Sequence, residues 1–305
     1  ISIEKSLSRL GGVAIFLSIL AYHGGVYFSQ KEFFEGPSLL DSSDVSVYLS
    51  VSLVFGMIGL AEDIKQGIRP IIRMLMMITI AGIYFLLYPG HMPQTLLFPF
   101  FNDFLNSFPL LWLASTVFIV GFINAGNMVD GANGLFALIM LGLFYLAFSL
   151  TGEVSYWAIF ISLCIFVVFN LTTGKIFLGD FGAYGLSALG AIVAFNLYDN
   201  FDISLWFLAS LLSYPCTELV RVIVVRLSNR KSPLGSDNQH LHNFVFYFLE
   251  SKGCAPHLAN SLTGILISFY FSITPILLYL IGSVPLNSTL WIYLFFIQVL
   301  SVLFG

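Results

Sequence analysis

Ten long apolar segments dominate this sequence, and they restrict the chain to a membrane. Each approaches the length of about 20 residues that an α-helix needs to cross the hydrocarbon core of a bilayer. They cover residues 11–28, 46–61, 71–88, 110–125, 134–150, 155–171, 183–198, 203–221, 259–282 and 288–304. Only 9% of the residues are charged, whereas a soluble domain carries about a quarter. The sequence therefore predicts an all-α, polytopic transmembrane helix bundle.

Nothing in the sequence indicates a separate soluble domain, so residues 1–305 are predicted to form a single integral membrane domain. The net charge is −4 and no basic tract is present, which argues against nucleic-acid binding. The three cysteines have no spacing typical of a disulfide framework or a metal cluster. The opening ISIEKSLSRLGG is polar and lacks a Met, so we expect further residues before it.

Alternating spans assign each connecting loop to one side of the membrane. One side collects 1–10, 62–70, 126–133, 172–182 and 222–258, and eleven of the 12 Lys and Arg residues lie on or beside it. Lys31 is the exception, and it lies among acidic residues on the other side. Cytoplasmic loops carry an excess of Lys and Arg. The first side is therefore predicted to be cytoplasmic.

Four polar clusters fall on that cytoplasmic side. They are Glu62-Asp63 with Arg69 and Arg73, NAGNMVDGANG over 124–134, Asn170 with KIFLGDFG over 175–182, and SPLGSDNQHLHN over 232–243. Carboxylates are the protein ligands that Mg²⁺ prefers, and substrate phosphates usually complete its coordination. Arg and Lys neutralise phosphate charge. The four loops together are predicted to form one active site suited to a divalent cation and a pyrophosphate.

Each cluster also has a simpler interpretation. An acidic pair at a helix end, such as Glu62-Asp63, is often merely solvated, and Asp130 and Asp180 could each cap the following helix. His240 and His242 are two residues apart, so in an extended segment both would point the same way; alternatively they are two loop histidines in contact with water. Glu218 and Arg221 are spaced to pair across a helix end, and we favour that structural interpretation.

Taken in this order, the clusters resemble the polyprenyl-phosphate N-acetylhexosamine-1-phosphate transferase superfamily, the bacterial glycosyltransferase family 4. The matching pieces are RLGG at 9–12, Glu62-Asp63 followed by Arg73, NAGNMVDGANGL at 124–135, GKIFLGDFGAYG at 174–185 and SPLGSDNQHLHN at 232–243. The resemblance runs from about residue 9 to residue 243, and it implies one more span preceding residue 1. It implies a membrane enzyme that starts lipid-linked glycans of the O-antigen or capsule type.

The resemblance also implies roles for individual residues. Asp63 and Glu62 would lie close to the attacking lipid phosphate as catalytic residues, and Asp180 would be catalytic and hold Mg²⁺, with Asp63 as a second ligand. The remaining matches are implied to bind substrate. These are Asn127, Asp130 and Asn133 in the nucleotide site, Asn170 and Phe177 in the uracil pocket, and Gly179, Arg73, His240 and His242 near the phosphates.

Several positions depart from the family pattern. Glu62 replaces an Asp, Asn133 replaces an Asp common in relatives, Asn243 replaces a His, and Ser8 stands where Pro is frequent. The aspartates at 63 and 180 are retained, which favours an active enzyme over an inactive member of the superfamily.

The expected reaction transfers an N-acetylhexosamine-1-phosphate from a UDP-sugar to polyprenyl (undecaprenyl) phosphate and releases UMP. The expected cofactor is Mg²⁺, with Mn²⁺ as the alternative, and the expected location is the bacterial inner membrane with the active site facing the cytoplasm. The sequence leaves a homodimer open. A membrane transporter is the competing function, but transporters place ionisable groups near the bilayer midplane, whereas these carboxylates lie in loops and at helix ends.

Overall fold

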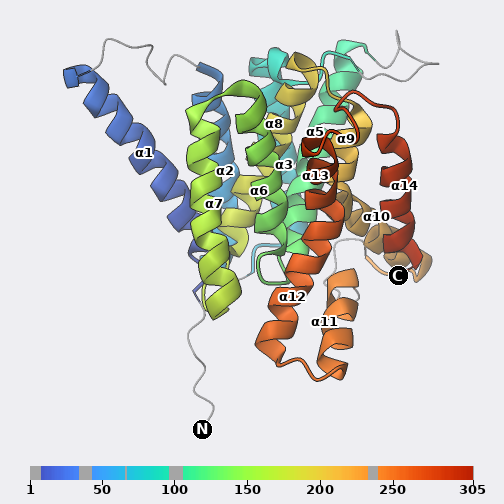
Figure 1. Cartoon of the computed structure of the whole chain (residues 1–305). Coiled ribbons are helices and arrows are strands. Elements are labelled where there is room, and N and C mark those ends of the chain that lie inside the picture. Colours follow the sequence, from blue (N-terminus) through green and yellow to red (C-terminus); the bar gives the residue numbers. More distant parts are fainter. Residues whose placement is uncertain (1–7, 34–42, 66, 96–105, 233–239, 305) are drawn as a thin grey trace.

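The computed structural model describes residues 8–33, 43–65, 67–95, 106–232 and 240–304, and it is helical throughout (Figure 1). The longer helices are α1 (Gly11–Phe33), α2 (Ser43–Lys65), α3 (Pro70–Leu87), α5 (Phe108–Val129), α6 (Leu135–Thr151), α7 (Val154–Thr173), α8 (Gly179–Asn200), α10 (Ser213–Ser228), α12 (Pro256–Ser268) and α14 (Trp291–Phe304). The shorter ones are η1 (Pro89–His91), α9 (Leu205–Leu211), α11 (Leu241–Ser251), η2 (Phe269–Ile273) and α13 (Thr274–Leu280). Within the described residues, the β-type pairing is one parallel bridge between Ser8 and Ile176.

Proline and glycine set several helix boundaries. Pro70 and Pro256 open α3 and α12, where a missing N–H costs nothing. Gly152 and Gly174 follow α6 and α7 with φ of 70° and 58°, the left-handed conformation that ends a helix. Gly134 has φ of 73° directly before α6, so this helix is limited to 17 residues.

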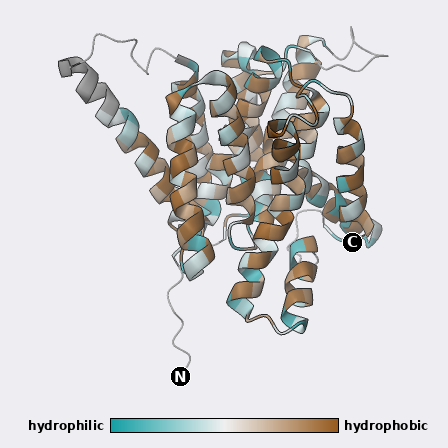
Figure 2. Cartoon of the chain, viewed as in Figure 1, coloured by the Kyte–Doolittle hydropathy of each residue, from teal (hydrophilic) through white to brown (hydrophobic). Residues whose placement is uncertain are grey.

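All ten apolar segments predicted from the sequence are helical, but ten spans are not confirmed. Within the part of the chain that the structure describes, six helices are long and apolar enough to cross a membrane, and a seventh is counted if α9 and α10 form one bent span. Gly11–Gly25, Leu135–Thr151 and Trp291–Phe304 are apolar but shorter. Figure 2 shows the apolar residues along the helices, which fits a bundle in lipid.

Helix α8 occupies the centre of the bundle. In the most apolar 18-residue stretch of α8, 83% is buried inside the protein, against 28% in the corresponding stretch of α3. It packs against α1, α2, α5 and α6. Gly, Ala and Ser residues make up much of α8, and small residues let helix backbones approach closely inside a membrane. Asp180, in the first turn of α8, is thereby placed among several neighbouring helices.

A break between α9 and α10 bends the chain by 74°. Gln298 on α14 is fully buried beside it, accepts a hydrogen bond from Ser213 Oγ (2.9 Å) and donates to Phe271 O (2.9 Å) in the π-helical turn η2. Ser272 Oγ donates to Leu211 O (2.7 Å) at the break itself. Side chains thus satisfy backbone groups that the break and the π-turn release.

The segment 222–258 is more helical than the predicted loop. Helix α10 continues to Ser228, and α11 forms over Leu241–Ser251. Phe244, Tyr247 and Phe248 project from α11 at helical spacing and are exposed, while His242 on the same helix is buried. The segment joining α10 to α11 includes residues 233–239, so Asp237 lies outside the described residues.

Replacing Gln298 by Leu is expected to lower the melting temperature of the purified protein. The change leaves the carbonyl of Phe271 without this buried donor, and a buried unsatisfied polar group costs about 1–3 kcal/mol. The hydroxyl of Ser213 loses Gln298 but can still donate to Ser210 O. The control is Ser301→Ala, since Ser301 Oγ bonds only to a carbonyl of its own helix in this structure. Equal melting temperatures for Q298L and S301A would contradict the assigned role of Gln298.

Candidate active site

Three helix ends meet through glycine contacts at the lower end of the bundle in Figure 1. A Cβ added at Gly59 on α2 would lie 2.2 Å from the carbonyl oxygen of Asp180, and one added at Gly12 on α1 would lie 2.1 Å from the Cα of Gly182. The backbone N–H of Gly12 also donates to Leu178 O (2.8 Å). The start of α1, the end of α2 and the start of α8 are therefore held in direct contact.

Two arginines lie among the three carboxylates that these helices carry. Arg73 Nη1 is 3.5 Å from Glu62 Oε1 and 3.8 Å from Asp180 Oδ2, and Arg9 Nη1 is 3.8 Å from Asp63 Oδ1. These distances exceed those of a direct hydrogen bond. The side chain of Arg9 is 60% exposed. The arginines thus offset the acidic charge through loose pairs, which an entering anion could replace.

Backbone N–H groups orient the two acidic residues at the end of α2. Phe181 N–H donates to Asp63 Oδ2 (3.2 Å), and Ile68 N–H donates to Glu62 Oε2 (3.1 Å). Phe181 lies in the first turn of α8, whose positive dipole end favours a carboxylate. Asp63 is consequently held across the interface between α2 and α8 and beside Asp180.

Asp130 ends α5 and joins the same acidic group. Burial raises the pKa of Asp130 well above its usual value, and the carboxylates of Asp180 and then Asp63 raise it further. A direct contact joins Asp63 to the start of α8, where Asp180 lies. The convergence of Asp130 with these two aspartates stays a prediction.

His242 is buried against the loop that follows Asp130. A Cβ added at Gly131 would lie 2.5 Å from His242 Nε2, so only a glycine fits here without displacing the ring. Burial, followed by the influence of His240, lowers the pKa of His242 to about 4, and the ring is neutral at neutral pH. The Tyr214 hydroxyl oxygen is 3.0 Å from Nδ1 of His242 and accepts a hydrogen bond from the backbone N–H of His242 (3.2 Å). The hydroxyl can then donate its own hydrogen bond to Nδ1, so the neutral ring carries its proton on Nε2.

His240 precedes α11 in extended backbone, with φ of −95° and ψ of 150°. Its ring stacks on that of His242, with centroids 5.2 Å apart and an angle of 13° between planes. The extended segment assumed in the sequence argument does not form, because only His240 is extended and His242 belongs to α11. The histidine segment therefore presents two parallel rings beside the Asp130 loop.

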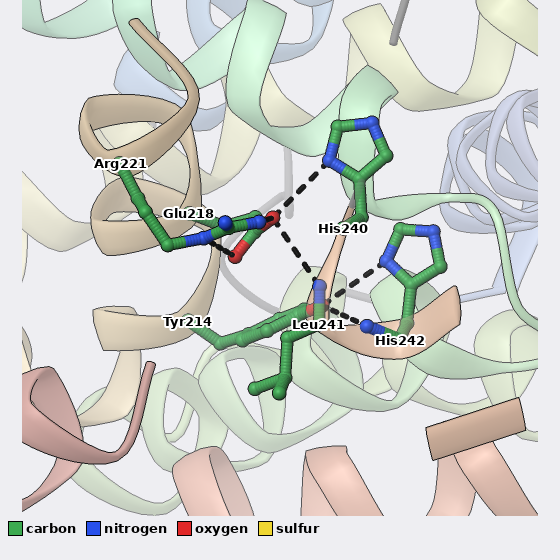
Figure 3. Close-up of polar contacts among 6 residues, drawn as sticks. All are labelled: Tyr214, Glu218, Arg221, His240, Leu241 and His242. Atoms are coloured by element: carbon green, nitrogen blue, oxygen red, sulfur yellow. Dashed lines mark hydrogen bonds and ion pairs between the residues drawn. The ribbon is translucent and has the colours of Figure 1, made fainter. Parts of the chain in front are cut away.

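Glu218 is a partner of His240 that was not predicted from the sequence (Figure 3). Glu218 is fully buried, pairs with Arg221 as predicted, and also lies 3.1 Å from His240 Nδ1 and 3.4 Å from the backbone nitrogen of Leu241. The spacing of three residues to Arg221 suggested only an ion pair at a helix end. The available signal was an acidic residue in an otherwise apolar stretch, YPCTELV, which requires internal partners in a membrane protein.

The predicted nucleotide-site residues lie on neighbouring segments. Asn133 and Asn170 are both buried, and each side-chain oxygen has no hydrogen-bond partner among the described residues. Asn170 Nδ2 donates to Ile176 O (2.6 Å), one residue before Phe177, and Asn133 Nδ2 donates to Ser261 Oγ (3.1 Å). Asn127 is partly exposed on α5, one turn before Asp130. Buried amide oxygens without partners favour a ligand that donates hydrogen bonds.

Gly179 occupies a position that other residues would strain. Its φ is 75°, and an added Cβ would lie 2.2 Å from the carbonyl oxygen of Arg9 and 2.9 Å from Asp63 Oδ2. The absence of a side chain therefore brings the backbone of α8 against the Arg9 segment and next to an acidic oxygen.

The acidic group could hold a divalent cation only with help from a substrate. The described part of the chain holds no set of three or more His, Cys, Asp or Glu side chains arranged around a metal ion. Asp63 Oδ1 is buried and accepts no hydrogen bond from the described residues. Mg²⁺ commonly binds one or two carboxylates and takes its other ligands from phosphates and water. Asp63 and Asp180 fit that kind of site.

Known proteins with similar sequences support one family. The model of a family described as "Glycosyl transferase family 4" matches residues 45–198. A probable undecaprenyl-phosphate N-acetylglucosaminyl 1-phosphate transferase of Bacillus subtilis is 25% identical over 98% of this chain and 79% of its own length. An undecaprenyl-phosphate alpha-N-acetylglucosaminyl 1-phosphate transferase of Thermotoga maritima is 32% identical over 42% of this chain. A phospho-N-acetylmuramoyl-pentapeptide-transferase of Staphylococcus epidermidis is 31% identical over 54%. The matches cover 40% and 56% of the lengths of these last two relatives.

Replacing Asp130 by Asn is expected to stabilise the folded protein at neutral pH. A carboxyl whose pKa is raised on folding opposes folding once the pH exceeds its unfolded pKa, so removing its charge raises stability there. The gain should disappear at low pH, where Asp130 is protonated in both states. A gain of ~1 kcal/mol would raise the melting temperature by about 2–4 °C.

The matched control is Glu250→Gln, which removes an exposed carboxylate on α11 and should leave the melting curve unchanged. A lower melting temperature for D130N at neutral pH would contradict the repulsion assigned to the three aspartates.

Proposed function

Because this chain belongs to glycosyl transferase family 4, we propose that it transfers a sugar-1-phosphate to a polyprenyl phosphate in the membrane. The proposed donor is a UDP-N-acetylhexosamine, the acceptor is undecaprenyl phosphate, and UMP is released. The product is the first lipid-linked intermediate of a glycan of the O-antigen or capsule type. The relatives that transfer N-acetylglucosaminyl 1-phosphate support this donor class.

The observation that carries the proposal is the meeting of carboxylates and cations from distant segments. Glu62, Asp63 and Asp180 lie around Arg73 and Arg9, and Asp130 lies close enough for its pKa to be raised by two of them. A purely structural role explains such a group poorly, since like charges placed together oppose folding. A substrate with phosphates, together with a cation, would offset this repulsion.

The proposed transfer is a direct displacement. An oxygen of the lipid phosphate forms a bond to the β-phosphorus of the UDP-sugar, and the bond from that phosphorus to the bridging oxygen breaks. The bridging oxygen leaves with its electron pair on UMP. A phosphate monoester is already largely ionised at neutral pH, with a second pKa near 6. Asp63 therefore orients the acceptor and has little need to act as a strong base.

The proposed cofactor is Mg²⁺, with Mn²⁺ as the alternative, held by Asp180 and Asp63. When bound, such an ion supplies charge that stabilises the diphosphate and its leaving group. Two unit charges 4 Å apart repel by about 4 kcal/mol at an effective dielectric of 20. Arg9 and Arg73 would offset part of this repulsion by turning from the carboxylates to substrate oxygens.

The proposed donor site lies between the Asp130 loop and the end of α7. The buried oxygen of Asn170, which accepts no hydrogen bond from the described chain, would accept from an N–H of the uracil ring. Phe177 would pack against that ring. Asp130 and Asn127 would contact the nucleotide, and His240 and His242 would face the phosphates. The lipid enters from the bilayer, and the site faces the cytoplasm of a bacterial inner membrane.

Asp180→Asn is expected to abolish transfer. The assay incubates membranes containing the protein with radiolabelled UDP-N-acetylhexosamines and Mg²⁺, and measures label in the organic extract together with released UMP. Loss of the carboxylate removes the proposed metal ligand, so the rate should fall by more than about 100-fold, comparable to loss of a main electrostatic contributor. EDTA should have the same effect on the wild type.

Glu250→Gln serves as the control and should retain full activity, because Glu250 is exposed near the end of α11. Full activity of D180N would remove the metal assignment. Failure of the wild type to label lipid with any UDP-N-acetylhexosamine would remove the proposed reaction.

The orientation can be tested with single cysteines in a variant lacking Cys164, Cys216 and Cys254. An impermeant thiol reagent should label Glu250→Cys only when it has access to the cytoplasm. Glu153→Cys, in the turn before α7, should be labelled only from the outside, because that turn lies at the opposite end of the bundle (Figure 1). The reverse pattern would invert the proposed topology.

A further inference from the structure

Glu218 is the most deeply buried carboxylate of the described chain, and the proposed reaction gives it no task. Its exposure is 0%, and taking an ion out of water is costly unless its partners are well placed. Its partners are Arg221 on its own helix and the segment of His240 and Leu241. An ion pair with Arg221 alone would form equally well at an exposed helix end and does not explain why Glu218 is buried. The contact with the histidine segment does explain the burial.

The geometry at His240 is that of an oriented imidazole. Oε1 of Glu218 lies 3.1 Å from His240 Nδ1, so the carboxylate accepts a hydrogen bond from Nδ1–H. The same oxygen lies 3.4 Å from the N–H of Leu241, which fixes the backbone beside the ring. With Nδ1 committed to Glu218, a phosphate could contact this ring only through Nε2. A carboxylate behind a histidine sets both its tautomer and its orientation.

The two stacked histidines are held differently. Tyr214, one turn before Glu218 on α10, contacts His242 at Nδ1 with a neutral hydroxyl, whereas Glu218 contacts His240 with a carboxylate. Figure 3 shows both contacts reaching from α10 toward the histidine segment. One helix therefore sets the position of both rings but gives only His240 an acidic partner.

We propose that Glu218 is a positioning residue for the transfer reaction, which holds His240 with Nε2 directed at a phosphate of the substrates. The inference rests on the proposed function. Glu218 itself touches no substrate and acts only through His240. Its effect on the rate should therefore depend on the presence of the histidine.

A double-mutant cycle tests this dependence, using wild type, Glu218→Gln, His240→Asn and the double variant in detergent or vesicles. Glu218→Gln should lower the transfer rate by about 10- to 100-fold, the range for carboxylates that orient a functional histidine at metal sites. In the His240→Asn background the same change should cost less than about threefold, because interacting residues are not additive. Equal losses in both backgrounds would overturn the proposal.

A second measurement does not depend on activity. In protein labelled with nitrogen-15 histidine, the Nδ1 proton of His240 should give a downfield resonance, identified by its absence in His240→Asn. It should move upfield in Glu218→Gln, whose neutral amide oxygen accepts a weaker hydrogen bond than a carboxylate, and stay in place in Glu250→Gln, the matched exposed control. An unchanged resonance in Glu218→Gln would overturn the contact. If Glu218→Gln does not fold, Glu218→Asp, which keeps the charge but shortens the side chain, takes its place in both experiments.

The outcomes separate this inference from the proposed function. A wild type that gives no lipid-linked product with any UDP-N-acetylhexosamine removes the reaction and, with it, the role of Glu218. An active wild type with additive losses, or with an unchanged Nδ1 resonance in Glu218→Gln, removes the role of Glu218 alone.

Discussion

A polar group inside a membrane bundle must find its partner within the protein, and this constraint organises the molecule. Gln298 and Ser272 satisfy backbone groups where α9, α10 and η2 depart from regular helix. Glu218 can be buried because Arg221 and His240 form hydrogen bonds with its carboxylate. The bend at α10 and the site it supports thus depend on the same requirement. Breaks in helices are tolerated here where side chains replace the lost backbone bonds.

The architecture was largely predictable because hydropathy reports burial in lipid directly. The helical character of all ten apolar segments followed from composition and length. The number of spans did not, since glycines such as Gly134 and Gly152 shorten α6 and the bend divides the segment 203–221. Periodicity reveals an apolar helix but not the angle at which it meets the next one.

The individual site residues were predictable in type but not in partnership. Asp180 stands out because it interrupts apolar sequence, whereas His242 lies in the polar segment 232–243 and was identified through the resemblance. Glu218 also interrupts apolar sequence, but Arg221, three residues later, already accounted for its charge as an ion pair. His240 is 22 residues away from it, so their contact arises only from the fold of α10 against the segment before α11. Long-range pairing of this kind leaves no local spacing signal.

The glycine contacts around α8 have a consequence for how such proteins diverge. Where Gly12 meets Gly182 and Gly59 meets Asp180, backbones touch directly, so the separation of the acidic residues is set by atomic radii and not by the size of any side chain. Residues on the lipid-facing surface can then drift during evolution without altering the distances among the carboxylates.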